Sequence, residues 1–367
     1  MSTLPPNTVP LDDVLRFQRD SCAALGSSLY ADLLEATAID VAAGGPCASA
    51  LRPHEGDPFG SALPLRFLGA IHRLVLDGRA PALAAHYPSV GGAPRAGLVD
   101  DFLATVPELR AEIEARIDDG VQTNEVGRAA ALVGGFVEVA RRSGLPLRVL
   151  EVGASAGLNL RWDQFWYDTG ASSFGDPGSP VRFVGMWEGS LPVLDDVPVT
   201  VAERAGCDRS PIDPTSQDGR RTLRSYLWPD MRDRLARLDA ALDVAARVPA
   251  SVDAADVGDW LGRRLADPVA GVATVVYHSI VWQYLPARSR DRMRVALRRA
   301  GEAAPAGAPV AWLRLEPSGP VADLRLTYWP GGGGADGGGR AGTNDEVLAT
   351  SKYHGVPVYW GTRGERP

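Results

Sequence analysis

A run of small residues between a predicted strand and a predicted helix carries the clearest chemical signal in this sequence. Residues 147–152 are apolar apart from Arg148 and Glu151, which is typical of a buried β-strand, and Gly153-Ala154-Ser155-Ala156-Gly157 follows at once. Small residues let a ligand approach the backbone closely, and a carboxylate such as Glu151 can bind the polar groups of that ligand. The pattern predicts a nucleotide-like ligand at the end of a parallel sheet.

Three classes of enzyme use a turn of this kind. A dinucleotide-binding turn requires G-x-G-x-x-G, and here Ser155 and Leu158 replace the second and third glycines. A serine hydrolase requires G-x-S-x-G, which residues 153–157 match with Ser155 as the nucleophile. The helical pattern before the turn and the lack of an HGGG motif argue against that class. Its triad would need Asp253 or Asp256 and His278 or His354.

The third class is the methyltransferases that bind S-adenosylmethionine. Their cofactor-binding pattern is an apolar strand, an acidic residue, one further residue and then G-x-G-x-G. Glu151, Gly153 and Gly157 match this pattern, with Ser155 in place of the middle glycine. We therefore interpret the segment as the cofactor site of a methyltransferase that acts on an oxygen or nitrogen atom of a small molecule. A serine hydrolase and a non-catalytic ligand-binding protein on the same fold are the alternatives. A turn that needs small residues only for packing would have the same composition.

Polar residues further along the chain are expected to complete the cofactor site. An acid at the end of the second strand, Asp208 or else Asp213, would bind the ribose hydroxyls, and Asp256 or else Asp253 would face the adenine amino group. His278 follows the apolar run 272–277 and would act as a general base or orient the substrate. The predicted cofactor-binding residues are Glu151, Gly153, Ala154, Ser155, Gly157, Asn159, Asp208 and Asp256.

Residues 122–128 are expected at the start of a helix and contain five polar or charged side chains. The N-terminus of a helix binds anions, and Arg128 can form a bidentate pair with a carboxylate. This segment would cover the cofactor or the substrate, or else form an internal network in which Glu125 pairs with Arg128. Aromatic residues after the glycine turn would line the pocket or pack in the core. The predicted substrate-binding residues are Gln122, Asn124, Glu125, Arg128, Trp162, Asp163 and Tyr277.

The hydrophobic pattern indicates two domains. Residues 1–10 are expected to be disordered, residues 11–143 have helical periodicity, and residues 144–367 alternate strands and helices. Asp208 lies 57 positions after Glu151 instead of about 20, so we expect an irregular insertion near residues 174–198. We also expect residues 331–342 to form a flexible glycine-rich loop. The predicted fold is α/β, with a doubly wound, Rossmann-like methyltransferase sheet preceded by an α-helical N-terminal domain.

The composition and charge of the sequence indicate which binding partners and which cellular compartment to expect. A formal net charge of −7 argues against sequence-independent binding of nucleic acid. No apolar run reaches the length of a membrane span and no leader opens the chain, so we expect a cytoplasmic protein that does not interact with membranes. The three cysteines and five histidines show no metal-ligand spacing, so no metal is predicted. The expected partner is a small-molecule substrate, and the oligomeric state is not predicted.

Several of these segments together resemble one protein family, the uncharacterised domain-of-unknown-function family 2332. The similarity extends from about Phe17 to Trp360. That family is grouped with class I methyltransferase-like proteins, so the resemblance implies a methyltransferase-like fold and S-adenosylmethionine as cofactor. The matching segments are 122–128, 150–163, 175–180, 228–230 and 277–286.

Overall fold

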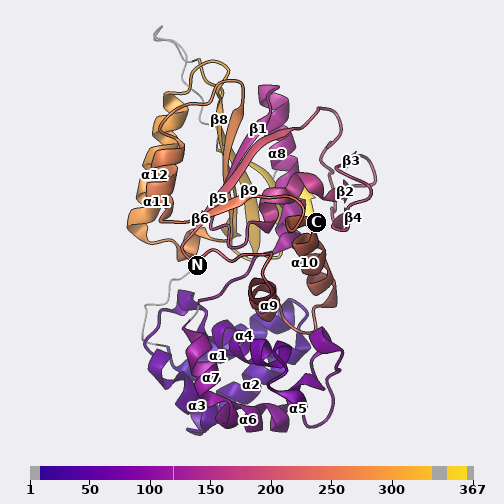
Figure 1. The fold of residues 1–367 in the computed structure, drawn as a ribbon, viewed down its shortest axis with the longest axis vertical. Helices are drawn as coiled ribbons and strands as arrows, with labels where there is room; N and C mark the ends of the chain where they lie inside the picture. The colour runs from indigo at the N-terminus through magenta and orange to yellow at the C-terminus, as the bar shows by residue number, and fades with distance from the viewer. Residues whose placement is uncertain (1–8, 119, 333–344, 362–367) are drawn as a thin grey trace. The chain divides into compact units, whose positions relative to one another are not determined.

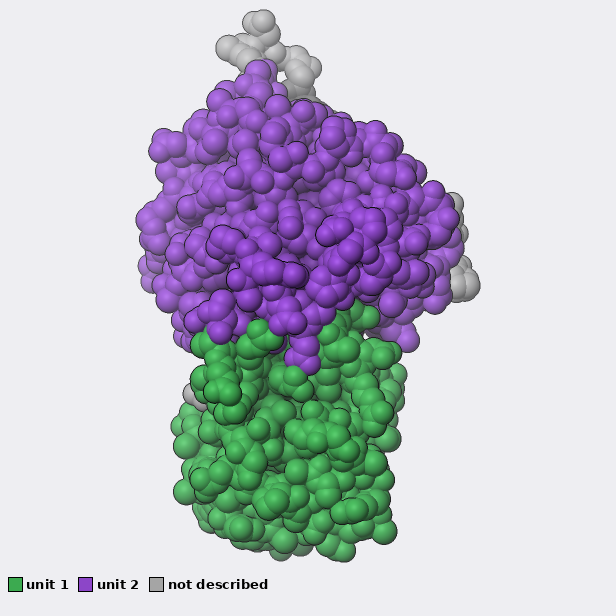
Figure 2. All heavy atoms as spheres, turned by 45° about the vertical axis from the view of Figure 1, so that its right-hand side comes forward, with its two compact units in different colours: residues 1–123, 216–238 green, residues 124–215, 239–367 purple. Residues whose placement is uncertain are grey.

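Figure 1 shows a computed structural model of the chain, which describes residues 9–118, 120–332 and 345–361. The chain divides into two compact units, one formed by residues 1–123 and 216–238 and the other by residues 124–215 and 239–367 (Figure 2). The expected helical domain ended at residue 143. Helix α8 (Ala129–Ser143) instead belongs to the second unit, because it packs against strands β7 to β10 of the sheet.

The first unit is helical, and its two chain segments share one core. Apolar side chains such as Phe67, Ile71 and Phe102 are buried together with Trp228 from the second segment. The Ser27 hydroxyl caps α2 by accepting from the Tyr30 N–H and also donates to Asp230 (2.6 Å). The helices are α1 (Leu11–Ala24), α2 (Ser28–Ala42), α3 (Pro46–Leu51), α4 (Leu63–Leu76), α5 (Pro81–Ala84), α6 (Leu98–Glu108), α7 (Arg110–Ile117) and α9 (Gln217–Ser225). Helix α10 (Arg232–Ala245) spans the junction between the units.

The second unit is built on an eight-stranded sheet with the order β11-β10-β9-β8-β7-β1-β5-β6. The five strands from β8 to β6 are parallel to one another, and β9, β10 and β11 are antiparallel additions at the β8 side. The strands are β1 (Leu147–Val152), β5 (Val201–Asp208), β6 (Ser251–Ala254), β7 (Ala273–Ser279), β8 (Val310–Ser318), β9 (Val321–Trp329), β10 (Asp345–Ser351) and β11 (Val358–Trp360). The predicted α/β class is therefore confirmed.

Helices cover both faces of the sheet. Helix α8 lies on one face, while α11 (Val257–Arg264) and α12 (Ala287–Glu302) lie side by side on the other (Figure 1). Every residue of β1 and of β7 is buried, because strands that are covered on both faces have no solvent-facing side. Leu150 and Val276 pack toward Met293 and Leu297 of α12.

The connection between β1 and β5 is long and contains a second, small sheet. A 3₁₀ helix, η5 (Leu158–Gln164), leads into strands β2 (Trp166–Asp168), β3 (Ser173–Phe174) and β4 (Arg182–Val184), which pair in the order β3-β2-β4. This connection explains the long spacing between Glu151 and Asp208. Residues 1–8 of the expected disordered segment and residues 333–342 of the expected glycine-rich loop lie outside the described residues. Within the described part of the chain, no helix has the length and apolar character needed to cross a membrane.

Candidate functional site

The glycine turn is attached to the carboxyl end of the neighbouring strand β5. The N–H groups of Gly153 and Ala154 both donate to the Cys207 carbonyl (2.9 and 3.1 Å). The Ser155 N–H donates to Oδ2 of Asp208 (2.9 Å), whose Oδ1 accepts from the Ser210 N–H (3.0 Å). The structure thus brings Asp208 to the turn despite its distance along the sequence, and both carboxylate oxygens bind backbone N–H groups.

The backbone of the turn explains its small residues. Gly153, Ser155 and Gly157 have positive φ angles of 67°, 51° and 66°. This region of φ favours glycine, so Ser155 holds a strained conformation. A Cβ atom on Gly153 would lie 2.4 Å from Cγ2 of Val281, in the loop after β7. The two glycines are therefore required by conformation and by close packing within the protein.

Glu151 is a buried carboxylate whose Oε2 has no hydrogen-bond partner among the described residues. It pairs across the strands with Tyr277 of β7, whose hydroxyl lies close enough to lower the pKa of the Glu151 carboxyl group. The Tyr277 ring packs edge-on against Phe136 of α8, so both side chains lie on the α8 face of the sheet. Burial raises the pKa of Glu151 to about 8, although the Tyr277 hydroxyl and the Arg161 guanidinium act in the opposite direction. This pair places two buried polar side chains beside the glycine turn.

Residues 124–128 contact the turn and the end of β7. The Leu158 N–H donates to Oδ1 of Asn124 (2.9 Å), and Nδ2 of Asn159 donates to the Glu125 carbonyl (3.2 Å). Oδ1 of Asn159 is buried and has no partner among the described residues. Arg128, in η4 (Val126–Arg128), donates through Nη1 to the Ser279 carbonyl (3.1 Å) and through Nε to the Tyr353 carbonyl (3.2 Å).

The predicted site residues of this segment divide between the units. Asn124, Glu125 and Arg128 lie at the carboxyl edge of the sheet, as the contacts above show, whereas Gln122 belongs to the first unit. Glu125 caps η4 by accepting from the Gly127 N–H (3.0 Å). The side chains of Asn124 and Arg128 form hydrogen bonds with main-chain groups, which hold the segment against the turn and the end of β7.

His278 lies on the opposite face of the sheet from Glu151, because neighbouring residues of a strand point to opposite sides. The indole N–H of Trp312 donates to its Nε2 (3.0 Å), and its Nδ1 lies 2.6 Å from Oε1 of Glu316. Because an indole nitrogen can only donate, Nε2 is the acceptor and the ring proton resides on Nδ1. The ring is fully buried and stacks on Trp282 (5.5 Å between centroids). General-base catalysis by His278 stays a prediction. It requires the hydrogen bond from the Trp312 indole N–H to Nε2 of His278 to break.

Two residues at this edge were missed by the sequence analysis. Oε1 of Glu316 binds His278 and also accepts the N–H groups of Val281 (3.1 Å) and Trp282 (3.3 Å). Arg161 is buried in η5 and donates from Nη1 to the Gly157 carbonyl (2.6 Å) and from Nε to the Val248 carbonyl (2.8 Å). Both are charged residues within apolar stretches, which is the one signal in the sequence that could have identified them.

Three predicted site residues have partners within the protein, and their roles in a site stay predictions. Asp256 caps α11 by accepting from the Gly258 N–H (2.9 Å) and also accepts from the Ser289 hydroxyl (2.6 Å), so its carboxylate is engaged in holding α11 and α12. Trp162 is fully buried and stacks between Phe136 and Phe174, which places it in the core. Asp163 forms an ion pair with Arg204 of β5 (2.6 Å).

Among the residues that the structure describes, no group of three or more His, Cys, Asp or Glu side chains is arranged to hold a metal ion. In the comparison with protein families, a model described as "Uncharacterized protein conserved in bacteria (DUF2332)" matches residues 12–360. The comparison with curated proteins finds no match.

Proposed function

The chain belongs to the DUF2332 family of uncharacterized proteins conserved in bacteria, and we propose that it transfers the methyl group of S-adenosylmethionine to an oxygen or nitrogen atom of a small molecule. The strand order supports this proposal. The five parallel strands follow one another in the sequence as β1, β5, β6, β7 and β8. Numbered 1 to 5 in that way, they lie side by side in the order 3-2-1-4-5 from β6 to β8. Doubly wound nucleotide-binding sheets have this order, and they bind ligands at the carboxyl ends beside the first strand.

The unpartnered carboxylate oxygen of Glu151 is the observation that carries the proposal. A buried carboxylate is costly unless a donor binds it, and the α-ammonium group of S-adenosylmethionine would provide such a donor. Oδ1 of Asn159 is a second buried acceptor without a partner among the described residues. These two residues fit the donor groups of the cofactor. Asp208 would contact the ribose only through lone pairs that its two backbone N–H partners leave unused.

Catalysis would depend mainly on proximity and orientation. When bound, S-adenosylmethionine supplies an electrophilic methyl group. The chain would hold the acceptor beside the end of β7, where Arg128 fixes the Ser279 carbonyl and Tyr277 presents its hydroxyl. His278 would accept a proton at Nε2 only after the indole of Trp312 moves away.

Isothermal titration of the full chain with S-adenosylmethionine and S-adenosylhomocysteine tests the proposal. The variant Glu151→Gln should weaken binding of both at least about tenfold, because it removes one charge-assisted hydrogen bond. Glu203→Gln is the matched control, since Glu203 lies on β5 and pairs with Arg148 at 2.7 Å. No binding to the wild-type protein, or equal binding by Glu151→Gln and wild type, would contradict the proposal. Binding without methyl transfer to any acceptor would favour the non-catalytic alternative.

The backbone of Ser155 supports a second candidate, a serine hydrolase. A nucleophile on a strand-to-helix turn is held in a strained conformation, and Ser155 has φ of 51°. However, Ser155 is buried and the turn leads into a 3₁₀ helix, whereas a nucleophile elbow exposes its serine before an α-helix. Labelling by a fluorophosphonate that is lost in Ser155→Ala would favour this candidate.

A further inference from the structure

A cavity of about 620 Å³ lies at the amino edge of the large sheet, away from the glycine turn. Its lining includes Arg148 near the start of β1, Thr274 near the start of β7 and Val310, the first residue of β8. Residues of α11 and α12, and of the segments that follow these two helices, form its remaining walls. The volume falls in the range of about 300–1,000 Å³ that is usual for small-molecule sites.

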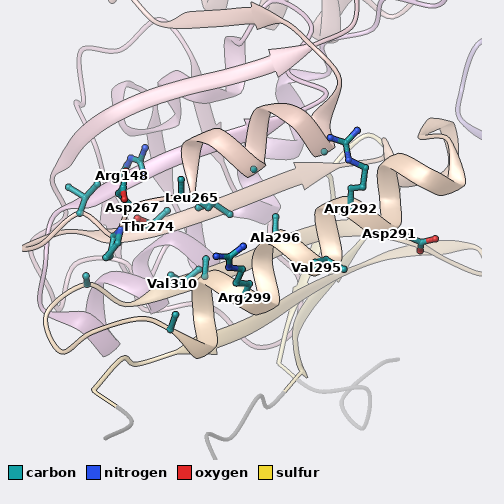
Figure 3. A pocket seen from close by; sticks show the side chains of 18 residues that line it. Arg148, Leu265, Asp267, Thr274, Asp291, Arg292, Val295, Ala296, Arg299 and Val310 are labelled. Atoms are coloured by element: carbon teal, nitrogen blue, oxygen red, sulfur yellow. The ribbon is translucent and has the colours of Figure 1, made fainter.

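Most of the lining is apolar and part of it is exposed. Leu265, which directly follows α11, and Ala296 of α12 contribute apolar surface (Figure 3). Val269 and Val295, which are 39% and 67% exposed, also belong to the lining. Single exposed valines are ordinary, but two at one cavity form an apolar surface that a ligand could cover.

Two guanidinium groups of the cavity retain unused hydrogen-bonding capacity. The Arg148 side chain is only 8% exposed; its Nε donates to Glu203 (2.7 Å) and its Nη1 to the Arg264 carbonyl (3.0 Å). Nη2 of Arg148 makes no hydrogen bond in the described part of the chain, and Arg299 has no ion pair or hydrogen bond there. Figure 3 shows Arg148 at one end of the cavity and Arg299 in its middle.

Two of the other charged residues of the lining have partners outside it. Arg292 pairs with Asp256 (3.7 Å) and with Asp259, and Asp291 pairs with Arg294 (3.1 Å). Asp267 is an exposed carboxylate with no ion pair among the described residues. Arg148 is therefore the largely buried donor at one end of the cavity, and it favours an anionic group on the ligand.

We propose that this cavity binds a small molecule with an apolar chain and a single carboxylate head. The carboxylate accepts a hydrogen bond from Nη2 of Arg148 and lies in the field of Arg299. The apolar chain of the ligand covers Leu265, Ala296 and Val310. This site is separate from the carboxyl edge, so its existence does not depend on the proposed methyl transfer.

Titration calorimetry of the full chain with decanoate, below its micelle concentration, tests this site. Decanoate should bind saturably, whereas decyltrimethylammonium, which has the same chain and the opposite charge, and acetate, which has the head alone, should not. Arg299→Ala should weaken decanoate binding about five- to tenfold through loss of the attractive charge. Ala296→Phe should abolish it by filling the cavity.

Arg298→Ala is the matched control, because Arg298 is the neighbouring arginine on α12 and does not line this cavity. It should bind decanoate as the wild type does. Thermal unfolding of each variant checks that the fold is retained. The proposal is overturned if decanoate does not bind, if decyltrimethylammonium binds equally well, or if a folded Ala296→Phe protein binds decanoate with wild-type affinity.

Discussion

At the scale of single residues, the chemistry of the candidate site depends on how completely Glu151 is removed from water. The sequence predicts an acid at the end of a buried strand, and the structure shows that one of its oxygens has no partner among the described residues. Residue type and position could be predicted because the strand and the turn are local patterns. The raised pKa could not, because it results from the burial that α8 and the neighbouring strands impose.

The pKa of Glu151 predicts an unusual dependence of stability on pH. Burial raises this pKa from 4.5 to about 8, so the folded state binds the proton more tightly than the unfolded chain. The free energy of unfolding should therefore fall as pH rises from about 4.5 to 8, by on the order of 4 kcal/mol from this residue. Glu151→Gln, which resembles the protonated acid, should remove this loss. Urea unfolding between pH 5 and 9 measures it, and parallel curves for variant and wild type would refute the assignment.

The hydrogen bonds of His278 predict its tautomer. Its Nε2 accepts from Trp312 and its Nδ1 faces Glu316, so ¹⁵N NMR of the imidazole should show the proton on Nδ1. Glu316→Ala should destabilise the protein by about 2–4 kcal/mol, since it leaves the imidazole and two backbone N–H groups without their acceptor. A spectrum with the proton on Nε2 would contradict this arrangement.

Asp256 illustrates what the sequence could not show about single residues. An aspartate before a helix can bind a ligand or cap the helix, and both roles leave the same pattern in the sequence. The structure shows the cap and a hydrogen bond from Ser289, which is 33 positions away. The sequence gives no information about such a distant partner.

At the scale of elements, α8 is the helix that covers the face of the sheet on which Glu151 and Tyr277 lie. It is buried almost throughout, and its Phe136 packs against Tyr277 and Trp162. The helix itself was predicted because its apolar pattern is local, but it was expected in the N-terminal domain. Periodicity identifies a helix without showing which sheet or bundle it covers.

Two glycine-to-alanine changes, one in α8 and one in α11, should have opposite effects on the stability of the protein. A Cβ on Gly135 would lie 2.5 Å from Leu313 of β8, so Gly135→Ala should destabilise the protein by about 1–3 kcal/mol. A Cβ on Gly262 of α11 would have no neighbour within 4 Å, so Gly262→Ala should stabilise it by about 0.5–1 kcal/mol through helix propensity. Chemical denaturation of both variants measures the difference. Equal effects would contradict the described contact between α8 and β8.

At the scale of the whole molecule, each unit is formed from two stretches of chain. Residues 216–238 complete the helical unit, although they follow the first five strands that the chain forms. The sequence predicted a single boundary because the pattern of helices changes to strands only once. Two-segment units arise from contacts between distant residues, such as the bond from Arg73 to Thr222 (2.8 Å), which no local pattern indicates.

The two-segment unit predicts how fragments of the chain behave. Residues 1–123 alone lack Trp228 of the shared core and Asp230, which accepts from the Leu29 N–H (3.0 Å). This fragment should show no cooperative thermal unfolding by circular dichroism. A chain that joins residues 1–123 to residues 216–238 through a flexible linker should unfold cooperatively. Cooperative unfolding of the shorter fragment with the same midpoint would show that the second segment is dispensable.

The proposed function requires Glu151 to bind a cationic group of the ligand at the carboxyl edge of the sheet. The most direct measurement is the pKa of Glu151, obtained by ¹³C NMR of its carboxyl carbon with and without saturating S-adenosylhomocysteine, and assigned with Glu151→Gln. We expect the pKa of Glu151 to be about 8 in the free protein. It should decrease by about 1–3 pH units when the ligand's ammonium group binds. A Glu151 pKa that is the same in the free and the ligand-saturated protein would contradict it.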